Sequence, residues 1–407
     1  MSGWPERPLG ELIDLFDYRR VPLSSAQRQQ RQGEYPYYGA QGIIDWIDDY
    51  IFDGRYLLIP EDGENLNSRK LPIAYFADGK FWVNNHAHIA RARPGAAVDR
   101  FIQCALQATN ISGFVTGAAQ PKLNQANLLR IPIRCPDVAT QRRVAAVFDA
   151  LDGLIENNTR RIEILEEMAQ AIYREWFVNF RYPGHEDVPL VDSELGPIPD
   201  GWRICTVADL CDRIQSGGTP RRTEPAFWDG GDVPWYKTGD LTDSILLDPS
   251  EFITAEAVSR STARMFEPET ILMAIYGSPT VGRLGLVSTP SSCNQAALGL
   301  SAKLGVVTIE YLWFVLAERR TYLNRVAQGA AQQNVSKTVV CSVPVVLPPH
   351  ELAKDFTDIA GPPWRLAHML TRQNRALRAT RDLLLPRLIS GEVDVSGLDI
   401  EVGELVS

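Results

Sequence analysis

Apolar residues recur alternately every four and three positions between Val138 and about Phe180. The positions are Val144, Phe148, Leu151, Ile155, Asn158, Ile162, Leu165, Ala169, Ile172 and Trp176. This spacing is typical of a coiled-coil seam, and Arg and Glu residues flank it. At about 1.5 Å per residue the pattern predicts a helix of roughly 65 Å if it is unbroken. No compact domain requires a helix of that length.

A second seam of the same kind begins near His350. We expect Gly361-Pro362-Pro363 to break its helix, because proline lacks an amide donor, and Pro362 to restart it. We also expect a kink or an end near Pro386 and a stop at Gly391. The seam positions after the break are Ala367, Leu370, Asn374, Leu377, Arg381, Leu384 and Leu388.

Each seam carries one asparagine near its middle, Asn158 and Asn374. Two seams of similar length in one chain most simply pair antiparallel, and a buried amide is least costly when it faces another. We therefore predict that the two asparagines lie in contact and fix the register. The alternative is two tolerated polar residues.

Ahead of each seam the pattern changes to short β-rich runs separated by Gly, Asp and Asn turns. Ala77-Asp78-Gly79-Lys80 predicts a tight hairpin, because Asp-Gly supplies the positive φ of such a turn. Each half therefore begins with a mixed α/β domain. The runs are 56–59, 73–76 and 81–83 in the first half, and 271–276 and 284–287 in the second.

The two halves share a sequence motif. Gly-Ala-Ala-Gln-Pro-Lys-Leu at 117–123 recurs as Gly-Ala-Ala-Gln-Gln-Asn-Val at 329–335. Each copy leads through an apolar strand, 131–136 or 343–348, into a long helical segment. The chain is thus an internal repeat with pseudo-two-fold character. The predicted boundaries are domain 1–136, helix 137–182, linker 183–201, domain 202–348, helix 349–391 and acidic tail 392–407.

The 407 residues are 45% hydrophobic, enough for more than one core. Six cysteines occur without a C-x-x-C pair, which argues against a zinc ribbon and for reduced cytosolic thiols. Met1-Ser-Gly-Trp-Pro-Glu is unlike a signal peptide, and no apolar run reaches the length of a membrane span. We expect a cytoplasmic protein with no membrane contact.

The net charge of −9 opposes DNA binding, because phosphate neutralisation needs Lys and Arg. Net charge describes a whole surface rather than one face, however. We expect weak DNA affinity for the chain alone, with partners supplying positive charge. Basic residues cluster at Arg19-Arg20, Arg28 and Arg31, Arg69-Lys70, and Arg221-Arg222, although each cluster is also compatible with an ordinary solvated surface.

Motifs of an enzyme are missing from the sequence. It has no glycine-rich cofactor loop and no phosphate-binding loop. Gly361-Pro-Pro-Trp364 lacks the leading Asn or Asp of a methyltransferase motif, and Pro60-Glu61-Asp62 with Lys70 has the wrong spacing for a nuclease. His86 and His88 alternate along a strand, so one should face inward and the other the surface. We expect no catalytic residue, cofactor or metal site.

Taken together, the chain resembles the DNA-specificity subunit of a type I restriction–modification system over nearly its whole length. The resemblance rests on the repeated motif, on segments 35–42, 56–63 and 79–88, on segments 233–240, 271–277 and 294–295, and on the helix 151–178. It implies an α+β fold with two target recognition domains and two long helices packed as an antiparallel coiled coil. It also implies a bipartite, gapped double-stranded DNA target, two methyltransferase subunits and a motor-nuclease restriction subunit as partners.

Recognition of bases would fall to loop residues. Arg and Lys suit guanine, and Asn and Gln suit adenine. Ordinary packing is the alternative for Tyr37, Tyr38 and Tyr276. The candidates in the first half are Tyr37, Tyr38, Gln41, Arg69, Lys70, Asn84, Asn85, His86 and Lys122. Those in the second half are Arg221, Arg222, Tyr236, Lys237, Thr238, Tyr276, Asn294, Gln295, Gln332, Gln333 and Lys337.

Two other functions remain open from the sequence. A two-headed adapter that binds protein or glycan would suit the charge of −9. An enzyme that acts on nucleic acid by itself would need a cofactor or metal motif.

Overall fold

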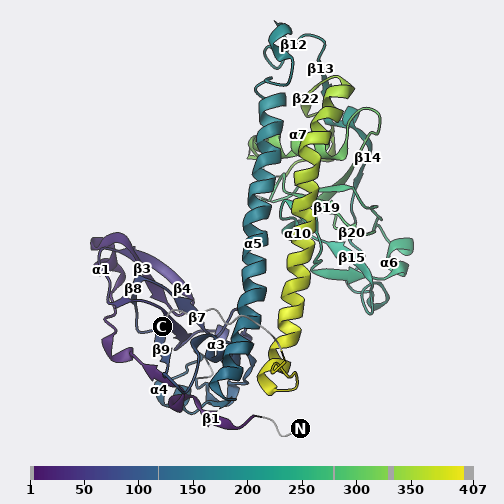
Figure 1. Cartoon of the computed structure of the whole chain (residues 1–407). Coiled ribbons are helices and arrows are strands. Elements are labelled where there is room, and N and C mark those ends of the chain that lie inside the picture. The colour runs from purple at the N-terminus through teal and green to yellow at the C-terminus, as the bar shows by residue number, and fades with distance from the viewer. Residues whose placement is uncertain (1–3, 118, 278–279, 329–333, 398–407) are drawn as a thin grey trace. The chain divides into compact units, whose positions relative to one another are not determined.

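The structure is a computed structural model that describes residues 4–117, 119–277, 280–328 and 334–397. It divides into two compact units, residues 1–155 with 376–407, and residues 156–375. Each unit contains one α/β domain and a segment of each of two long helices, α5 (Val138–Phe177) and α10 (His350–Ser390) (Figure 1). None of the described helices is long and apolar enough to span a membrane.

The first domain, the described part of residues 1–136, is built on two four-stranded sheets. One has the order β2 (Ile13–Leu15), β9 (Ala87–Ala92), β6 (Tyr56–Pro60), β7 (Tyr75–Ala77). The other has the order β4 (Gly42–Ile47), β3 (Gln32–Gly39), β8 (Lys80–Val83), β5 (Phe52–Asp53). β1 (Glu6–Pro8) pairs with β10 (Pro132–Arg134), and the helices are α1 (Ser25–Gln30), α2 (Asn65–Ser68), α3 (Asp99–Ala108) and α4 (Gln125–Leu129).

The second domain, the described part of residues 202–348, repeats this plan. Its large sheet has the order β14 (Cys211–Ser216), β21 (Ala297–Ala302), β18 (Ile271–Ala274), β19 (Leu284–Val287), β16 (Ser244–Leu246). Its small sheet has the order β17 (Glu251–Ile253), β15 (Val233–Tyr236), β20 (Ser292–Cys293). β13 (Arg203–Thr206) pairs with β22 (Pro344–Leu347), and the helices are α6 (Ala255–Arg260), α7 (Ile309–Glu318), α8 (Arg320–Gln328) and α9 (Lys337–Cys341).

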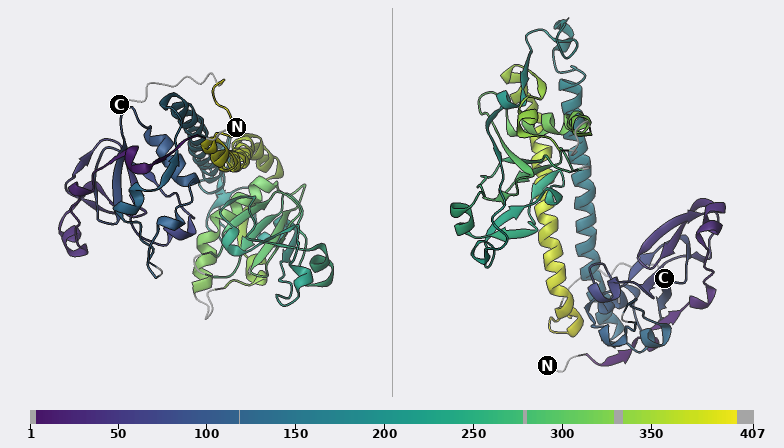
Figure 2. Two further views of the ribbon diagram at one scale, coloured as in Figure 1. Left: turned by 90° about the horizontal axis from the view of Figure 1, so that it is seen from below. Right: turned by 180° about the vertical axis from the view of Figure 1, so that it is seen from behind.

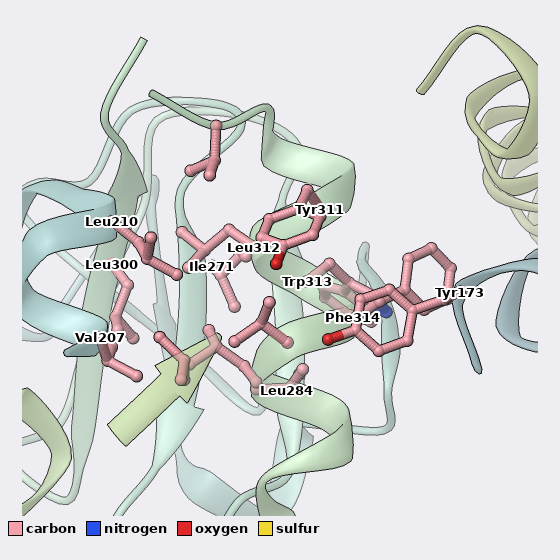
Figure 3. Packing of buried hydrophobic residues seen from close by; sticks show 14 of the residues in the cluster. Tyr173, Val207, Leu210, Ile271, Leu284, Leu300, Tyr311, Leu312, Trp313 and Phe314 are labelled. Atoms are coloured by element: carbon pink, nitrogen blue, oxygen red, sulfur yellow. The ribbon is translucent and has the colours of Figure 1, made fainter. Parts of the chain in front are cut away.

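The core of the second unit joins the large sheet to the long helices. Figure 3 shows Phe314 of α7 beside Tyr173 of α5, with ring centroids 5.7 Å apart. Tyr173 also packs edge-on against Phe356 of α10, at 5.9 Å. The segment between α5 and the second domain belongs to the same core, because Tyr182 and Ile198 are buried in it. This segment forms a small antiparallel pair, β11 (Leu190–Val191) with β12 (Ile198–Pro199).

The hairpin predicted at Asp78-Gly79 is wrong. Gly79 does take the positive φ of a turn, +75°, but the two flanking strands do not pair with each other. β7 pairs with β6 in one sheet, and β8 pairs with β3 and β5 in the other. After the turn the chain enters the other sheet, because Phe81 packs with Phe52 and Tyr56 in a core that both sheets share.

The predicted seam positions of both helices are buried or partly buried, with none exposed. The break predicted at Gly361-Pro362-Pro363 is wrong, because α10 continues through it and through Pro386 to Ser390. Phe356, Ala360 and Trp364 are all buried on both sides of the prolines. Their burial offsets the amide hydrogen bonds that proline cannot donate. The stop at Gly391 is confirmed by its φ of +76°.

The two long helices run in opposite directions where they contact each other inside a unit. In the second unit Asn158 Nδ2 donates to Asn374 Oδ1 at 3.0 Å, as the sequence predicted that these asparagines meet. Asn374 Nδ2 in turn donates to Thr159 Oγ1 at 3.2 Å. Both views of Figure 2 show these segments of α5 and α10 side by side. In the first unit Arg381 donates to Asp152 at 3.0 Å.

Candidate nucleic-acid interface

Equivalent loops meet at the same edge of each domain. In the first, Asn84 N donates to Tyr38 O at 3.0 Å, and in the second Asn294 N donates to Tyr236 O at the same distance. Each asparagine side chain then accepts from the amide two residues on, His86 at 2.8 Å or Ala296 at 3.1 Å. The two loops therefore share one backbone conformation and differ in the side chains they present.

The repeated motif docks beside these loops in both domains. Leu123 N donates to Glu61 O at 2.7 Å, and Val335 N donates to Ile275 O at 2.8 Å. One residue earlier, Lys122 bridges to Asp62 in the first domain and Asn334 bridges to Tyr276 in the second. These pairs define equivalent positions, so Lys122 corresponds to Asn334, Asp62 to Tyr276 and Glu61 to Ile275.

The loop cluster of the first domain is held by charges. Arg20 lies 2.9 Å from Glu61 and also donates to the carbonyl of Ala87 at 3.0 Å. Lys122 lies 3.3 Å from Glu61 and keeps an exposed ammonium. Although burial opposes it, these cations hold the pKa of the Glu61 carboxyl below its usual value. The loop cluster therefore rests on the partly buried ion pair of Arg20 with Glu61 and carries the exposed side chain of Lys122.

One of the two histidines is exposed and the other buried, as expected, but strand alternation is not the reason: residues two apart in a strand share a face, and His86 precedes β9. His86 is exposed and lies 2.6 Å from Asp62. His88 is buried, with Nδ1 2.5 Å from Asp17 and Nε2 2.8 Å from the carbonyl of Leu123. The imidazole of His88 thus joins the side chain of Asp17 to the backbone of Leu123. His88 thereby ties the repeated motif to the sheet beneath the loops.

The loop cluster of the second domain is more apolar at its base. Ile275 occupies the place of Glu61, and Leu298 occupies that of His88. Tyr276 is 41% exposed at its surface, and Gly277 N donates to Asn334 Oδ1 at 3.2 Å. Gln295 is exposed and accepts from Thr219. The charged side chains of the first cluster are replaced here by an aromatic side chain and amides.

Basic residues of the second domain lie on aromatic rings. The Arg222 guanidinium stacks 3.8 Å from the Trp228 ring and 5.0 Å from the Trp235 ring. Glu251 binds both Arg222 and Lys237, and these two cations lower the pKa of its carboxyl. Arg28 of the first domain is arranged alike, 5.2 Å from the Tyr37 ring and 2.9 Å from Asp45. The sequence analysis placed Arg222, but not Arg28, among the candidate readers.

Three of the candidate base-contacting residues pack or form hydrogen bonds inside their domains in this structure. Tyr37 and Tyr236 are buried, and the Tyr37 hydroxyl accepts from Leu23 N at 2.9 Å. Arg69 donates to the carbonyls of Leu106, Gln107 and Thr109 at the end of α3. In this conformation their polar groups serve packing and a helix terminus. The packing alternative therefore holds for Tyr37, and nothing in the sequence around Arg69 indicated its helix-end role.

The remaining candidates differ in exposure. Tyr38 is half-buried against Phe81, and Asn84 is buried. Lys337 is exposed, and its Nζ donates to the carbonyl of Ile214 at 2.5 Å. Gln332 and Gln333 lie outside the described residues. The other exposed candidates are Gln41, Lys70, Asn85 and Arg221, while Thr238 is half-buried. Arg20, which binds the base of the first cluster, was recognised only as part of a basic pair.

A groove runs between the domain and the long helices in each unit. The groove of the first unit, about 450 Å³, is lined by Arg69, Lys70, Arg100 and Arg381 against Asp152 and Asp382. That of the second, about 660 Å³, is lined by Glu166, Glu167, Glu175, Asp243 and Glu318 against Arg174 and Arg320. The two equivalent grooves thus have opposite charge balance.

Two domains that share one loop framework, each continuing into a long helix, define a protein with two recognition sites. The family model for the type I restriction modification DNA specificity domain matches residues 1–167 and 199–358, so the chain belongs to that family. The chain is therefore a DNA-recognition component of a restriction–modification system and not a catalytic one.

Individual relatives agree with this assignment. A Haemophilus influenzae protein named as a type I restriction enzyme specificity subunit is 28% identical over 298 residues, 71% of this chain and 69% of that protein. The MjaIX specificity subunit of Methanocaldococcus jannaschii is 22% identical over 346 residues, covering 83% and 79%. The crystal structure of a type I S subunit from M. genitalium has the same fold, with a TM-score of 0.65 at 14% identity over 95% and 96% of the chains.

Proposed function

We propose that each domain reads one short half-site of a bipartite, gapped DNA target. The observation that carries this proposal is one loop framework with two sets of side chains. Asn84, Asn85, His86 and Lys122 occupy in the first domain the places that Asn294, Gln295, Ala296 and Asn334 occupy in the second. A shared backbone would meet similar DNA geometry twice, while different side chains would select different bases.

The separation of the half-sites is assigned to the long helices as an antiparallel coiled coil. The contact between Asn158 and Asn374 supports this pairing in the second unit, and the Arg381–Asp152 pair supports it in the first. Both pairs fit one antiparallel register. Facing asparagines would fix that register, because a one-heptad slip in either direction would place Asn374 against Leu151 or Leu165.

Partner subunits complete the assembly in this proposal. Two methyltransferase subunits would dock on the scaffold, and a restriction subunit would join for cleavage, in the cytoplasm. Exposed apolar residues on the long helices, Ile164, Met168, Ile359 and Met369, offer docking surface. The net charge of −9 also favours DNA binding as a complex, with partners contributing cations.

Genome-wide adenine methylation with and without this gene tests the reading function. We expect methylation to disappear at a single bipartite motif when the gene is deleted. Restoring the gene with Asn85→Ala or Gln295→Ala, at exposed positions that differ between the domains, should relax one half of the motif each. A motif that does not depend on the gene, in a host where the partner subunits are expressed, would instead favour the adapter.

A deletion of one heptad from each long helix tests the spacing function. Seven residues correspond to roughly 10 Å of helix, or about 3 bp of duplex. We expect both half-sites to persist while the gap between them shortens by about that amount. A matched variant with seven alanine substitutions on the exposed face of α5 should leave the gap unchanged. An unchanged gap in the deletion variant would refute the spacing role.

A further inference from the structure

The hairpin of β3 and β4 in the first domain exposes apolar side chains at its tip. Ile43 and Ile44 are 45% and 52% exposed. A β-bulge lies between the pairings of Tyr37 and Tyr38, so Ile44 is an extra residue in its strand. A bulge re-aims side chains, which explains why two consecutive residues both face outward. Exposed neighbouring apolar residues of this size mark a contact surface.

The tip is held in a fixed conformation before any ligand arrives. The Tyr75 hydroxyl donates to the carbonyl of Gly39 at 2.6 Å and accepts from Gly42 N at 3.1 Å. These bonds fasten the turn at Ala40-Gln41 from one side, and Gln41 remains exposed. A preorganised tip loses little conformational entropy on binding.

The tip adjoins the loop cluster of the first domain. A side chain at Gly39 would lie 2.9 Å from Ile44 Cγ2 and 3.6 Å from Asn84 Nδ2. Ile44 and Asn84 therefore both lie close to the buried Gly39, so the hairpin tip is a direct neighbour of the loop at Asn84. The apolar tip extends the interface that carries Asn85 and Lys122.

The tip of the hairpin carries no charge that would repel a nucleic acid. From Tyr38 to Ile44 the sequence contains no charged residue. The acids that follow are neutralised, since Asp45 lies 2.9 Å from Arg28 and Asp48 lies 2.9 Å from Arg31. In the described part of the second domain β15 and β17 also pair antiparallel, but no tight turn joins them, because residues 237–250 between them contribute β16 to the large sheet.

We propose that this hairpin is a two-stranded ribbon that enters the major groove at the first half-site, where Ile43 and Ile44 contact a thymine methyl group. The major groove admits a two-stranded ribbon, and the thymine methyl is the apolar group that it presents. Gln41 at the turn would pair with an adjacent adenine. The proposal rests on the two-site DNA reading above and names a chemical feature of one half-site. A protein partner is the competing occupant.

Deoxyuridine tests the methyl contact, because it removes only that methyl group. The assay is binding of the chain, reconstituted with its methyltransferase subunits, to its mapped target with deoxyuridine in one half-site at a time. We expect replacement in the first half-site to weaken binding about four- to fifteenfold, the range for one or two buried methyl groups. Ile44→Ala should weaken binding comparably and reduce the further effect of deoxyuridine, because only Ile43 then remains against the methyl group. Replacement in the second half-site should weaken the wild-type and Ile44→Ala complexes equally.

Several outcomes would overturn the ribbon. One is an Ile44→Ala effect that simply adds to the deoxyuridine effect, and another is a first half-site without any A·T pair. Loss of methyltransferase subunit from the Ile44→Ala complex would assign the tip to a protein partner instead. Leu304→Ala, at an exposed leucine of the second unit, is the matched control and should bind like wild type. Failure of the wild-type complex to prefer its mapped target would contradict the proposed function itself.

Discussion

The two domains keep the same backbone framework but support it with different chemistry. Beneath the loops of the first domain, His88 and Glu61 form an ionic network with Asp17 and Arg20. Beneath those of the second, Leu298 and Ile275 provide an apolar support. Backbone hydrogen bonds are matched at each place. The repeat therefore preserves the position of the loops, whereas their electrostatic environment is particular to each domain.

The contact between each domain and the long helices shows the same divergence with the charges exchanged. The second residue of α3, Arg100, pairs with Asp149 at 2.9 Å. The second residue of α7, Glu310, pairs with Arg365 at 2.6 Å. The charged residues that line the groove are mainly cations in the first unit and mainly carboxylates in the second. Two identical partner subunits would meet unlike grooves, so docking confined to the grooves could not be symmetric.

The largest difference between the units is expected on removal of the arginine from each pair. Glu310 is only 2% exposed, so Arg365→Ala leaves a buried carboxylate without its cation. We expect a loss of about 3 kcal/mol in the unfolding free energy of the second unit. Arg100→Ala leaves Asp149 and Asp152, which are 43% and 38% exposed and can be hydrated, at a cost of about 1 kcal/mol. Urea unfolding followed by hydrogen exchange in each unit measures both.

Glu310→Gln in the Arg365→Ala background is the control for this prediction. Glutamine keeps the shape of the side chain and removes the buried charge, so most of the lost stability should return. Equal losses in Arg365→Ala and Arg100→Ala would show that burial of the carboxylate is not the cause.

Replacement of His88 by leucine makes the first domain resemble the second. His88→Leu removes two hydrogen bonds and leaves the buried Asp17 with fewer donors, which should cost about 2 kcal/mol. Because Leu123 loses its tie, amide exchange should accelerate at 122–124 and binding to the first half-site should weaken. Leu298→Met in the second domain is the volume-conserving control, with little expected change. Unchanged exchange at 122–124 would show that His88 does not position the motif.

Periodicity and repetition predicted the long helices, the repeated joint and a minority of the strands, among them β6, β18 and β19. The errors arose where a distant contact decided the outcome. Asp78-Gly79 is a turn as predicted, but Phe81 packs in a core that draws its strand into another sheet. Pro362 and Pro363 stay helical because buried neighbours hold α10 on the second unit.

The candidate readers show the same limit at the level of single residues. Lys122 and Arg69 are both loop cations in the sequence, yet one is exposed at the interface and the other closes a helix end. Tyr37 and Tyr276 are both tyrosines beside turns, yet one is buried and the other is exposed. Composition indicates which residue types can read bases, but burial decides which of them can reach DNA.

Lys122 and Asn334 occupy equivalent places with different charge, which predicts different salt dependence. Lys122→Ala should reduce the slope of log affinity against log salt by about 0.9, the value for one lost phosphate contact. Asn334→Ala should leave that slope unchanged and relax base preference at the second half-site. Binding of the reconstituted complex to its target over a range of salt concentrations measures both. A slope that is identical in wild type and Lys122→Ala would place Lys122 away from phosphate.

The smallest expected effect concerns Glu166 on α5, in the groove of the second unit. Burial, with Asp243 and Glu163 nearby, raises the pKa of its carboxyl from 4.5 to about 7. Below pH 4.5 the carboxyl is protonated in both folded and unfolded chains, so Glu166 costs nothing. Between pH 4.5 and 7 the unfolded chain releases the proton first, and folding stability falls as pH rises. Above pH 7 the full penalty is present.

Glu166→Gln should therefore raise the melting temperature by roughly 1–3 °C at pH 8 and leave it unchanged below pH 4.5. Asp382 is the matched control, since it lies roughly two helical turns beyond Asn374 as Glu166 does beyond Asn158. Its side chain is exposed and paired with Arg381, so Asp382→Asn should bring no gain that grows with pH. Melting curves of both variants across this pH range compare the pH dependence of stability at the two grooves. An equal gain in both variants would mean that general reduction of negative charge, rather than the acidic groove of one unit, sets the response.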